Sequence, residues 1–464
     1  MGVASVSLLV DSPLEKVRHM AHEALDTWVD ELAPLFAQEI TPQLTELSDH
    51  FQKTRFGLLG ACMKAVVEKL YAPYLSQRWA GCPRCGRTLC RKRLDQREVS
   101  TLHGSFAIER PYFYCQQCRH GFHPLDEALA LAPDYHQYDI QKRATAAAAK
   151  MPFAESAEHF EDLTGVVVGN HFSHETLNAV GEAATLEVVI PERDEIERRI
   201  SQAMGPSRTP PVLVVAADGA MMPTRPKAHR KAKRGKGRYQ EVKGFRLYLL
   251  SADDQIMPLA SWHQVQDAQR FHEDLALVAK RIDRDKVRTA LVGDGASWLW
   301  NAMVACFPQG RQILDFYHCA EHVHTVARAQ YGEGTLAGQQ WAEATLVRLC
   351  TAEVKTVLGA LRRSRPRNKE AQEEILKLIG YLENNSHRID YISNLKQGFP
   401  IGSGGIESAN KFICHTRMKR SGAWWVVASG NAMLRVRCAI YNGTFHRVFD
   451  HYIKRLSENL SQDK

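Results

Sequence analysis

The sequence predicts an α/β core in the middle of the chain, preceded by a helical region and a cysteine-rich β module. Strand-like and helical segments alternate between residues 205 and 330. Two Cys-x-x-Cys pairs accompany short β-like runs in 79–127, and apolar residues recur at helical spacing through 13–78. A chain of 464 residues exceeds what one compact core usually holds, so several domains are expected.

The N-terminal part is predicted to run helix, β, helix. Ser12 can cap the first helix, and GLLGACMKAVVEKLY continues the helical pattern. The β-like runs are REVSTLHG and FAIERPYFYC. Residues 128–200 return to helix, with a Thr-Gly turn before a second helix capped by Ser173. That arrangement is compatible with a helix-turn-helix, and plain helical packing is an equal alternative.

The core is predicted to follow the Pro- and Gly-containing linker at 205–211. Its five predicted strands are PVLVVAAD, KGFRLYLLS, QIMPLASWHQV, KVRTALVGD and RQILDFYH. Helices are predicted at 267–282 and 296–306, and the stretch from 320 to about 395 is helical and charged. After a break at Gly402–Gly405, two last helices are predicted at about 406–418 and 426–447.

The composition is that of an ordinary globular protein, with 44% apolar and 24% charged residues. No apolar run is long enough for a transmembrane helix, and the start lacks a signal-peptide pattern. The eleven cysteines do not resemble a disulfide framework, which favours a reducing compartment. We therefore expect a cytoplasmic, nucleoid-associated protein without a membrane partner.

The net charge of +8 is concentrated in one segment. Residues 225–246 contain ten Lys or Arg and one acidic residue, a local balance of 10 − 1 = +9. Such a patch attracts polyanions, although a solvated loop is the alternative. We expect it to contact DNA phosphates through Arg225, Lys227, Arg230, Lys231, Lys233, Arg234, Lys236 and Arg238.

The two Cys-x-x-Cys pairs predict a structural zinc site. Cys82 and Cys85 form the first pair, and Cys115 and Cys118 the second, with 29 residues between them. Each turn can present two thiolates, and a hairpin can bring the pairs together around one Zn²⁺. Four thiolates fill the coordination sphere, so this zinc should be structural, and Cys90 is not needed.

Two strand-like segments end in Asp-Gly-Ala, VVAADGA with Asp218 and LVGDGA with Asp294. An isolated carboxylate is costly to bury, and two neighbouring ones repel unless cations lie between them. Divalent ions about 4 Å apart, held by such carboxylates, are typical of phosphoryl-transfer sites. A third carboxylate is expected on a late helix, and Glu407 in IGSGGIESANK is the candidate. Regular helical spacing would place Lys411, Cys414 and Met418 on its face, with Arg417 on a basic flank.

These residues carry a resemblance to the ribonuclease H-like core of DDE transposases. The 112 residues between Asp294 and Glu407 resemble the all-α insertion of the Mutator-like and hAT-like groups. Asp315-Phe-Tyr-His318, on the predicted fifth strand, resembles their shared C/D-x-x-H signature. With the Cys-x-x-Cys pairs, VVAADGA, LVGDGASW, ILDFYH and GGIESANK most resemble bacterial insertion-sequence transposases of the Kra type. The resemblance covers roughly residues 79–450.

The resemblance implies a catalytic triad of Asp218, Asp294 and Glu407 that holds Mg²⁺ or Mn²⁺. It implies a transposase that binds transposon-end and target DNA, hydrolyses a phosphodiester and transfers the strand, as a homo-oligomer in the synaptic complex. Asp315 and His318 carry over only as the signature pair, and Lys411 and Arg417 are further expected DNA contacts. The rival hypotheses are a catalytically inert zinc-ribbon regulator derived from a transposase and a nuclease of the same fold without strand transfer.

The predicted organisation has six parts. They are a helical N-terminal region (1–78), a zinc ribbon (79–127), a helical region that can bind DNA (128–204), the first part of the ribonuclease H-like core (205–330), a helical insertion (331–400) and the final core helices (401–464). A second zinc at His318 and His322 is disfavoured because HCAEH lacks the HExxH pattern. Trp298 could stack on an unpaired base or belong to the core.

Overall fold

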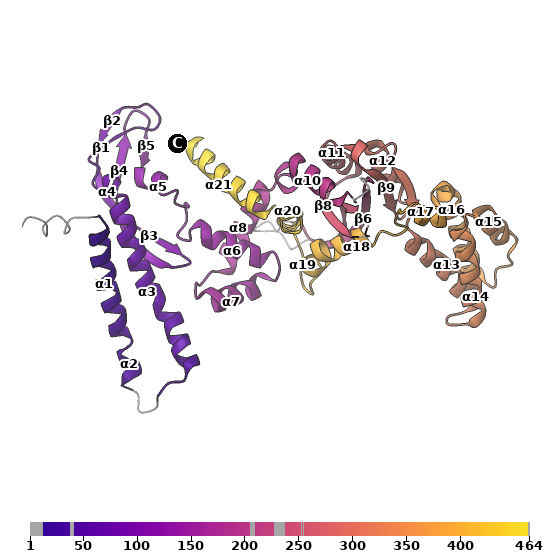
Figure 1. Cartoon of the computed structure of the whole chain (residues 1–464), viewed down its shortest axis with the longest axis horizontal. Coiled ribbons are helices and arrows are strands. Elements are labelled where there is room, and N and C mark those ends of the chain that lie inside the picture. The colour runs from indigo at the N-terminus through magenta and orange to yellow at the C-terminus, as the bar shows by residue number, and fades with distance from the viewer. Residues whose placement is uncertain are drawn as a thin grey trace, which may run out of the picture. The chain divides into compact units, whose positions relative to one another are not determined.

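The computed structural model describes residues 13–37, 41–204, 209–226, 237–251, 253 and 255–462 (Figure 1). Of these, the residues up to Thr176 and from Arg455 onward form one compact unit, and Leu177–Lys454 form the other. The chain is a mixed α/β protein with a helical N-terminal region. Within the described part, no helix is both long and apolar enough to cross a membrane.

The first unit begins with helices, as predicted. They are α1 (Pro13–Glu31), α2 (Ala33–Phe36), α3 (Leu44–Leu70) and α4 (Ala72–Leu75). Trp28 of α1 packs edge-on against Phe51 of α3, with ring centroids 4.9 Å apart. The Trp28 indole also donates a hydrogen bond to Thr54 at 3.0 Å. These contacts join the two long helices side by side.

A β module comes after the helices. A short antiparallel pair joins β1 (Trp79–Gly81) to β2 (Thr88–Cys90), and a three-stranded antiparallel sheet contains β3 (Arg93–Thr101), β4 (Gly104–Cys115) and β5 (His120–Phe122). The predicted β-like runs therefore fall on β3 and β4. Gly104, at the turn between them, has φ 123°, and a Cβ there would overlap the main chain of α3. This close approach packs α3 against the sheet.

Helices α5 (Pro124–Ala128), α6 (Tyr138–Ala148), α7 (Phe153–Thr164) and α8 (Asn170–Ala183) come next. Gly165 ends α7 in the left-handed conformation, as the Thr-Gly turn predicts. The expected cap at Ser173 is wrong. Helix α8 begins at Asn170, and the Ser173 amide already donates to the Gly169 carbonyl inside the helix. Ile140, Phe160 and Val166 share a small core beside these helices.

The second unit is built on one five-stranded sheet. After α9 (Leu186–Val189) and α10 (Arg193–Ala203) come β6 (Val212–Thr224), β7 (Arg238–Leu250), β8 (Ile256–Val265), β9 (Arg288–Gly293) and β10 (Arg311–Leu314). The strand order is β10-β9-β6-β7-β8. Strands β6, β7 and β8 are antiparallel, and β9 and β10 run parallel to β6. The first and fourth predicted strands are thus neighbours, as the acidic pattern required.

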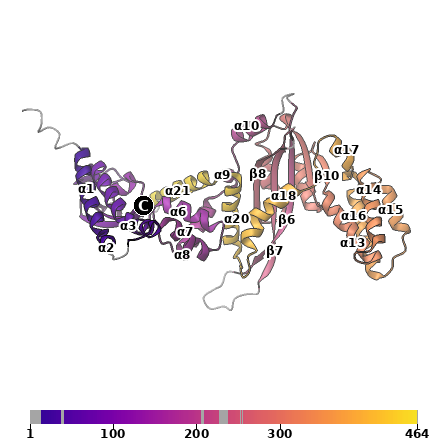
Figure 2. The ribbon, with the colours of Figure 1, turned by 60° about the horizontal axis from the view of Figure 1, so that its bottom comes forward.

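Helices cover both faces of this sheet. On one face lie α11 (Ala268–Ala279) and α12 (Ser297–Cys306). On the other lie α18 (Gly404–Asn410) and α20 (Val427–Asn442), which Figure 2 shows beside the strands. Neighbouring residues on β7 show the division, because successive side chains of a strand point to opposite faces. Phe245 packs on Phe271 of α11, whereas Arg246 donates to the Gly405 carbonyl of α18.

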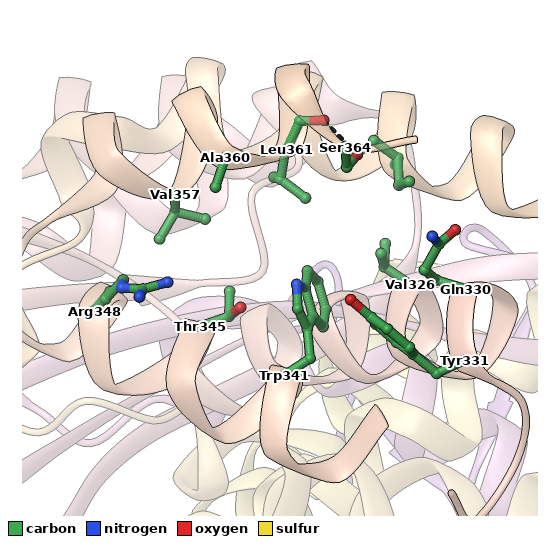
Figure 3. Close-up of a pocket in the computed structure, with 11 residues that line it drawn as sticks. Val326, Gln330, Tyr331, Trp341, Thr345, Arg348, Val357, Ala360, Leu361 and Ser364 are labelled. Carbon is green, nitrogen blue, oxygen red and sulfur yellow. Dashed lines mark hydrogen bonds between the residues drawn. The ribbon is translucent and has the colours of Figure 1, made fainter. Parts of the chain in front are cut away.

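The stretch between β10 and α18 is helical, as predicted. It contains α13 (Phe316–Tyr331), α14 (Leu336–Cys350), α15 (Val354–Arg363), α16 (Lys369–Asn385) and α17 (Tyr391–Lys396). These helices bury an apolar cluster that includes Val323, Leu349 and Leu378. Figure 3 shows a pocket within the bundle, with Tyr331 and Trp341 on one side and Leu361 on the other. None of the predicted catalytic residues lines it.

The last helices depart from the prediction. Helix α18 ends at Asn410 and continues as a π-helical turn (Lys411–His415) and α19 (Thr416–Met418). Because a π-turn holds an extra residue, it rotates the side chains beyond it about the helix axis. Glu407 and Lys411 are exposed, whereas Cys414 and Met418 beyond the extra residue are buried, so the predicted face common to all four residues is wrong. The helix predicted over 426–447 breaks at Gly443, in the left-handed conformation, before α21 (Phe445–Gln462).

Replacing Gly405 with Ala should destabilise the second unit by about 1–3 kcal/mol, because a Cβ there would overlap the Tyr248 ring of β7. Gly404→Ala is the matched control, since a Cβ at Gly404 meets nothing within 4 Å. Urea unfolding of both variants measures the difference. Equal stabilities would contradict the close packing of α18 on β7.

Candidate active site

Three neighbouring parallel strands each lead to an aspartate at the same edge of the sheet. The register pairs Ala216 of β6 with Val292 of β9, and Gly293 with Leu314 of β10. Continuing it along the strands brings Asp218, Asp294 and Asp315 level with one another. The prediction that Asp218 ends the first strand is wrong, because β6 continues to Thr224, whereas Asp294 directly follows β9. The two predicted carboxylates still lie level on adjacent strands, with Asp315 next to Asp294.

Glu407 is held over this edge by α18. The helix is hydrogen-bonded to three separate elements: the Ser403 amide donates to Asp315, Arg246 of β7 donates to the Gly405 carbonyl, and the Asn410 amide donates to Asp218. A carboxylate oxygen of Glu407 lies within 4.8 Å of ligand atoms of Asp315 and His318. A residue more than a hundred positions beyond Asp294 is thereby brought to the strand ends.

The carboxylates of the predicted triad interact electrostatically. The pKa of Asp218 is raised to about 6, mainly because the side chain is buried, and the charges of Asp294 and Glu407 raise it further. The Gly219 amide and the nearby His318 oppose this rise. Crowded carboxylates of this kind suit hard divalent cations such as Mg²⁺, which prefer oxygen ligands. Among the described residues, the potential ligand atoms within 4.8 Å of one another at this edge are those of Asp315, His318 and Glu407, and this group does not include Asp218 or Asp294.

A buried hydrogen-bond chain fixes Asp218. One carboxylate oxygen accepts from the Gly219 amide at 2.7 Å, and the other accepts from the Asn410 side chain at 2.7 Å. The Asn410 carbonyl in turn lies 2.9 Å from Nε2 of His263, a fully buried residue of β8. Burial lowers the pKa of His263 to about 4, so the ring is neutral and its Nε2 can donate. No sequence pattern singles out Asn410 or His263.

Asp315 and His318 form the second part of the site. The prediction that both lie on the fifth strand is wrong: β10 ends at Leu314, and Asp315 caps α13 by accepting from the His318 amide at 2.8 Å. Burial opposes ionisation of Asp315, but hydrogen bonds from His318 and Ser403 outweigh it and lower the pKa of Asp315. The Nδ1 atom of His318 lies 3.6 Å from the Asp315 carboxylate, an ion-pair distance. The interaction with Asp315 raises the pKa of His318 to about 9.

The helical insertion contacts the strand ends directly. The Tyr381 hydroxyl of α16 donates to the main-chain carbonyl of Asp294 at 3.0 Å. Its ring also packs on His322, with centroids 4.3 Å apart. Among the described residues, the possible metal clusters do not include His322. Trp298 packs against Phe271 and under the Lys243 ammonium, which leaves a core role better supported than base stacking.

The predicted DNA contacts fare unequally. Arg225 and Arg238, the first and last of the phosphate contacts predicted in the basic segment, are exposed. Lys411 is exposed at the start of the π-turn. Lys227, Arg230, Lys231, Lys233, Arg234 and Lys236 lie outside the described residues. Arg417 is only 3% exposed, and its guanidinium lies over the Trp425 ring. The predicted phosphate contact of Arg417 does not fit this burial, because the π-turn rotates it inward.

The four predicted cysteines lie together in the first unit. Their sulfur atoms are all within 4.8 Å of one another, and those of Cys85 and Cys115 are 3.8 Å apart. Four thiolates about 2.3 Å from one Zn²⁺ would be separated by about 3.8 Å. Burial raises the pKa of Cys82, but hydrogen bonds from the Cys85 and Arg84 amides outweigh it and lower that pKa to about 7. Hydrogen bonding with Cys85, together with burial, raises the pKa of Cys118 to about 12. Without a cation, the cluster cannot easily ionise all four thiols.

The chain belongs to the UPF0236 family, described as an uncharacterised protein family, whose model matches residues 43–454. No curated protein matches the sequence. Among solved structures, the chain is similar to a chain of the Drosophila P element transposase strand transfer complex, with 12% identity over 70% of this chain and 81% of the other. The TM-score of 0.26 does not establish a common fold.

We expect one zinc ion per chain, and Cys82→Ser or Cys115→Ser should remove nearly all of it, since a three-thiolate site is incomplete. Cys90→Ser is the matched control, because Cys90 lies outside the cluster. Elemental analysis of the purified proteins measures the content. Equal loss in the Cys90 variant, or none bound by the natural chain, would contradict the site.

The raised pKa of Asp218 predicts a destabilising carboxylate. The folded protein binds this proton more tightly than the unfolded chain, so stability is lost as pH rises from about 4 through 6. Asp218→Asn should therefore raise the stability of the magnesium-free protein at pH 7.5 by about 1–2 kcal/mol, and much less at pH 4.5. Added Mg²⁺ should stabilise the natural chain but not the variant.

Thermal unfolding with and without Mg²⁺ at both pH values provides the measurement. Asp285→Asn, a change at an exposed aspartate away from the strand ends, is the control. A variant that is less stable than the natural chain at pH 7.5, or that responds to Mg²⁺ as strongly, would refute the assignment.

Proposed function

We propose that this protein is a DDE transposase of the bacterial insertion-sequence Kra type. It binds transposon-end DNA, hydrolyses a phosphodiester there and joins the freed strand to target DNA. The observation that supports the proposal is that Asp218 and Asp294 lie level on adjacent strands, where the charges of Asp294 and Glu407 both raise the pKa of Asp218. Carboxylates held near one another repel, and bound divalent cations would relieve that repulsion.

The fold features agree with this proposal. Three antiparallel strands followed by two parallel ones, with Glu407 on a late helix, are what the resemblance to a ribonuclease H-like core implies. The helices between β10 and α18 stand where the resemblance expects an all-α insertion. Asp315 and His318 adjoin Glu407, as a signature pair near the catalytic acids would. The four-cysteine cluster supports the proposed zinc ribbon.

Asp218, Asp294 and Glu407 would hold the divalent ions. When bound, such ions lower the pKa of an attacking water and stabilise the leaving 3′-oxygen. The water oxygen would form the new bond to phosphorus and release a proton to solvent. The P–O3′ bond would break, and the leaving 3′-oxygen would take up a proton from solvent, which yields a 3′-hydroxyl and a 5′-phosphate. In strand transfer that hydroxyl replaces the water, so the same carboxylates serve both steps.

The protein's own groups prepare this edge. Asn410 and Gly219 fix the two oxygens of Asp218, and Ser403 and His318 fix those of Asp315, so the carboxylates are oriented before substrate binds. The cationic His318 offsets part of the negative charge in the absence of metal. Without cations the remaining charge repels a phosphodiester, so cleavage should require Mg²⁺ or Mn²⁺.

The test uses a plasmid that carries the DNA flanking the gene, incubated with the protein and Mg²⁺. Asp294→Asn and Glu407→Gln should each reduce end cleavage by about 100-fold or more, because each removes a metal ligand. Their DNA binding should be unchanged. Glu370→Gln, at an exposed position of α16, is the control and should cleave normally.

Detection of both nicked ends and joined products separates the hypotheses. Cleavage without joining would favour the nuclease, and DNA binding without either reaction would favour the inert regulator. Cleavage that survives the loss of Asp294 or Glu407 would refute the proposed triad.

A further inference from the structure

The β6–β7 ribbon extends past the rest of the sheet. Pairing of β6 with β9 ends at Ala216, and pairing of β7 with β8 ends at Val242, but the two strands stay paired to Thr224 and Arg238. At roughly 3.3 Å per residue, Thr224 lies about 20 Å beyond Asp218. The ribbon therefore projects from the edge that holds the carboxylates.

Trp425 braces this ribbon. Its amide donates to the Pro223 carbonyl at 3.1 Å, and its carbonyl accepts from the Arg225 amide at 2.8 Å. The indole of Trp425 is buried and donates to the Met418 carbonyl at 3.1 Å. A rigid backbone is thus fixed beside the end of the ribbon.

Two large aromatic rings remain open at this point. Tyr239 is 60% exposed and Trp424 is 41% exposed, with ring centroids 6.0 Å apart and planes tilted by 58°. Gly237 lies against the Trp424 ring so closely that a Cβ would overlap it. Packing of one ring side on a glycine backbone fixes Trp424 without covering it completely.

The surroundings of the rings are cationic. Arg225 and Arg238 are exposed and adjoin the ring residues: Arg238 directly precedes Tyr239, and the Arg225 amide donates to the carbonyl of Trp425, the residue after Trp424. Open aromatic rings beside positive charge match the chemistry of a nucleic acid strand, whose bases offer flat apolar faces and whose phosphates are anionic. Duplex DNA hides the base faces within its stack, whereas an unpaired strand presents them.

We propose that Tyr239 and Trp424 form a stacking site for unpaired DNA bases, with Arg225 and Arg238 contacting the adjoining phosphates. The proposal rests on the proposed function, since it assumes that DNA is the ligand. The site lies about 20 Å along the ribbon from the catalytic edge, which corresponds to about six nucleotides of strand. It would hold a single-stranded stretch near the end being cleaved or joined.

The experiment compares binding of a labelled 20-nucleotide single strand and a hairpin duplex by fluorescence anisotropy, using the full chain at fixed salt without added magnesium. Trp424→Leu and Tyr239→Leu should each weaken single-strand binding about tenfold and duplex binding by less than about twofold. Trp424→Phe and Tyr239→Phe, which keep a ring, should bind nearly normally. The double variant Arg225→Ala, Arg238→Ala should bind both the single strand and the duplex more weakly, and this binding should depend less on salt.

Loss of single-strand affinity in the leucine variants, restored by phenylalanine, supports the site. The proposed site is overturned if the leucine variants bind the single strand normally, or if their affinities for the single strand and the duplex fall by the same factor. If Trp424→Leu fails to fold, as thermal unfolding would reveal, the Tyr239 pair decides. If single-strand binding depends on the two rings but the natural chain does not cleave DNA, only the proposed function is overturned. If the natural chain cleaves DNA but the leucine variants bind the single strand normally, only this stacking site is overturned.

Discussion

Mutual repulsion among carboxylates is the constraint on which the second unit depends. Asp218, Asp294 and Asp315 lie level on neighbouring strands, and burial together with the charges of Asp294 and Glu407 opposes ionisation of Asp218. Hydrogen bonds from Ser403, Arg246 and Asn410 hold α18 against this repulsion. The close packing of Gly405 on Tyr248 and the hydrogen bonds of Asn410 and His263 help to keep the acids together.

The fixing groups differ in their response to pH. His263 is buried and neutral through the physiological range, so its hydrogen bond to Asn410 does not depend on ionisation. His318, by contrast, carries positive charge below about pH 9 and lies among carboxylates. One imidazole thus acts as a constant donor behind the site, while the other supplies charge within it. Strand β8 places His263, and the first turn of α13 places His318.

Much of this architecture could be predicted because its signals are local. Asp218 and Asp294 follow apolar strand segments, and the cysteine spacing alone brings four thiols together. Other features depend on tertiary contacts that no local pattern reveals. Asp315 was expected to continue a strand, but the hydrogen bond to its own helix end makes it a cap. The π-turn after Asn410 changes which side chains of 411–418 face inward, so Arg417 packs on Trp425 instead of meeting solvent. His263 stands in an apolar run without any distinguishing pattern.

The hydrogen bond from Tyr381 to the main chain of Asp294 makes the helical insertion part of the wall around the edge that holds the aspartates. Asn385 of the same helix also lies close to Gly295. A shortened protein in which α13 through α17 were replaced by a simple loop would keep all three acids yet lose the support behind one of them. A shortened core therefore needs another hydrogen-bond donor in place of the Tyr381 hydroxyl. Relatives with shorter insertions should likewise place a donor at the carbonyl that corresponds to Asp294.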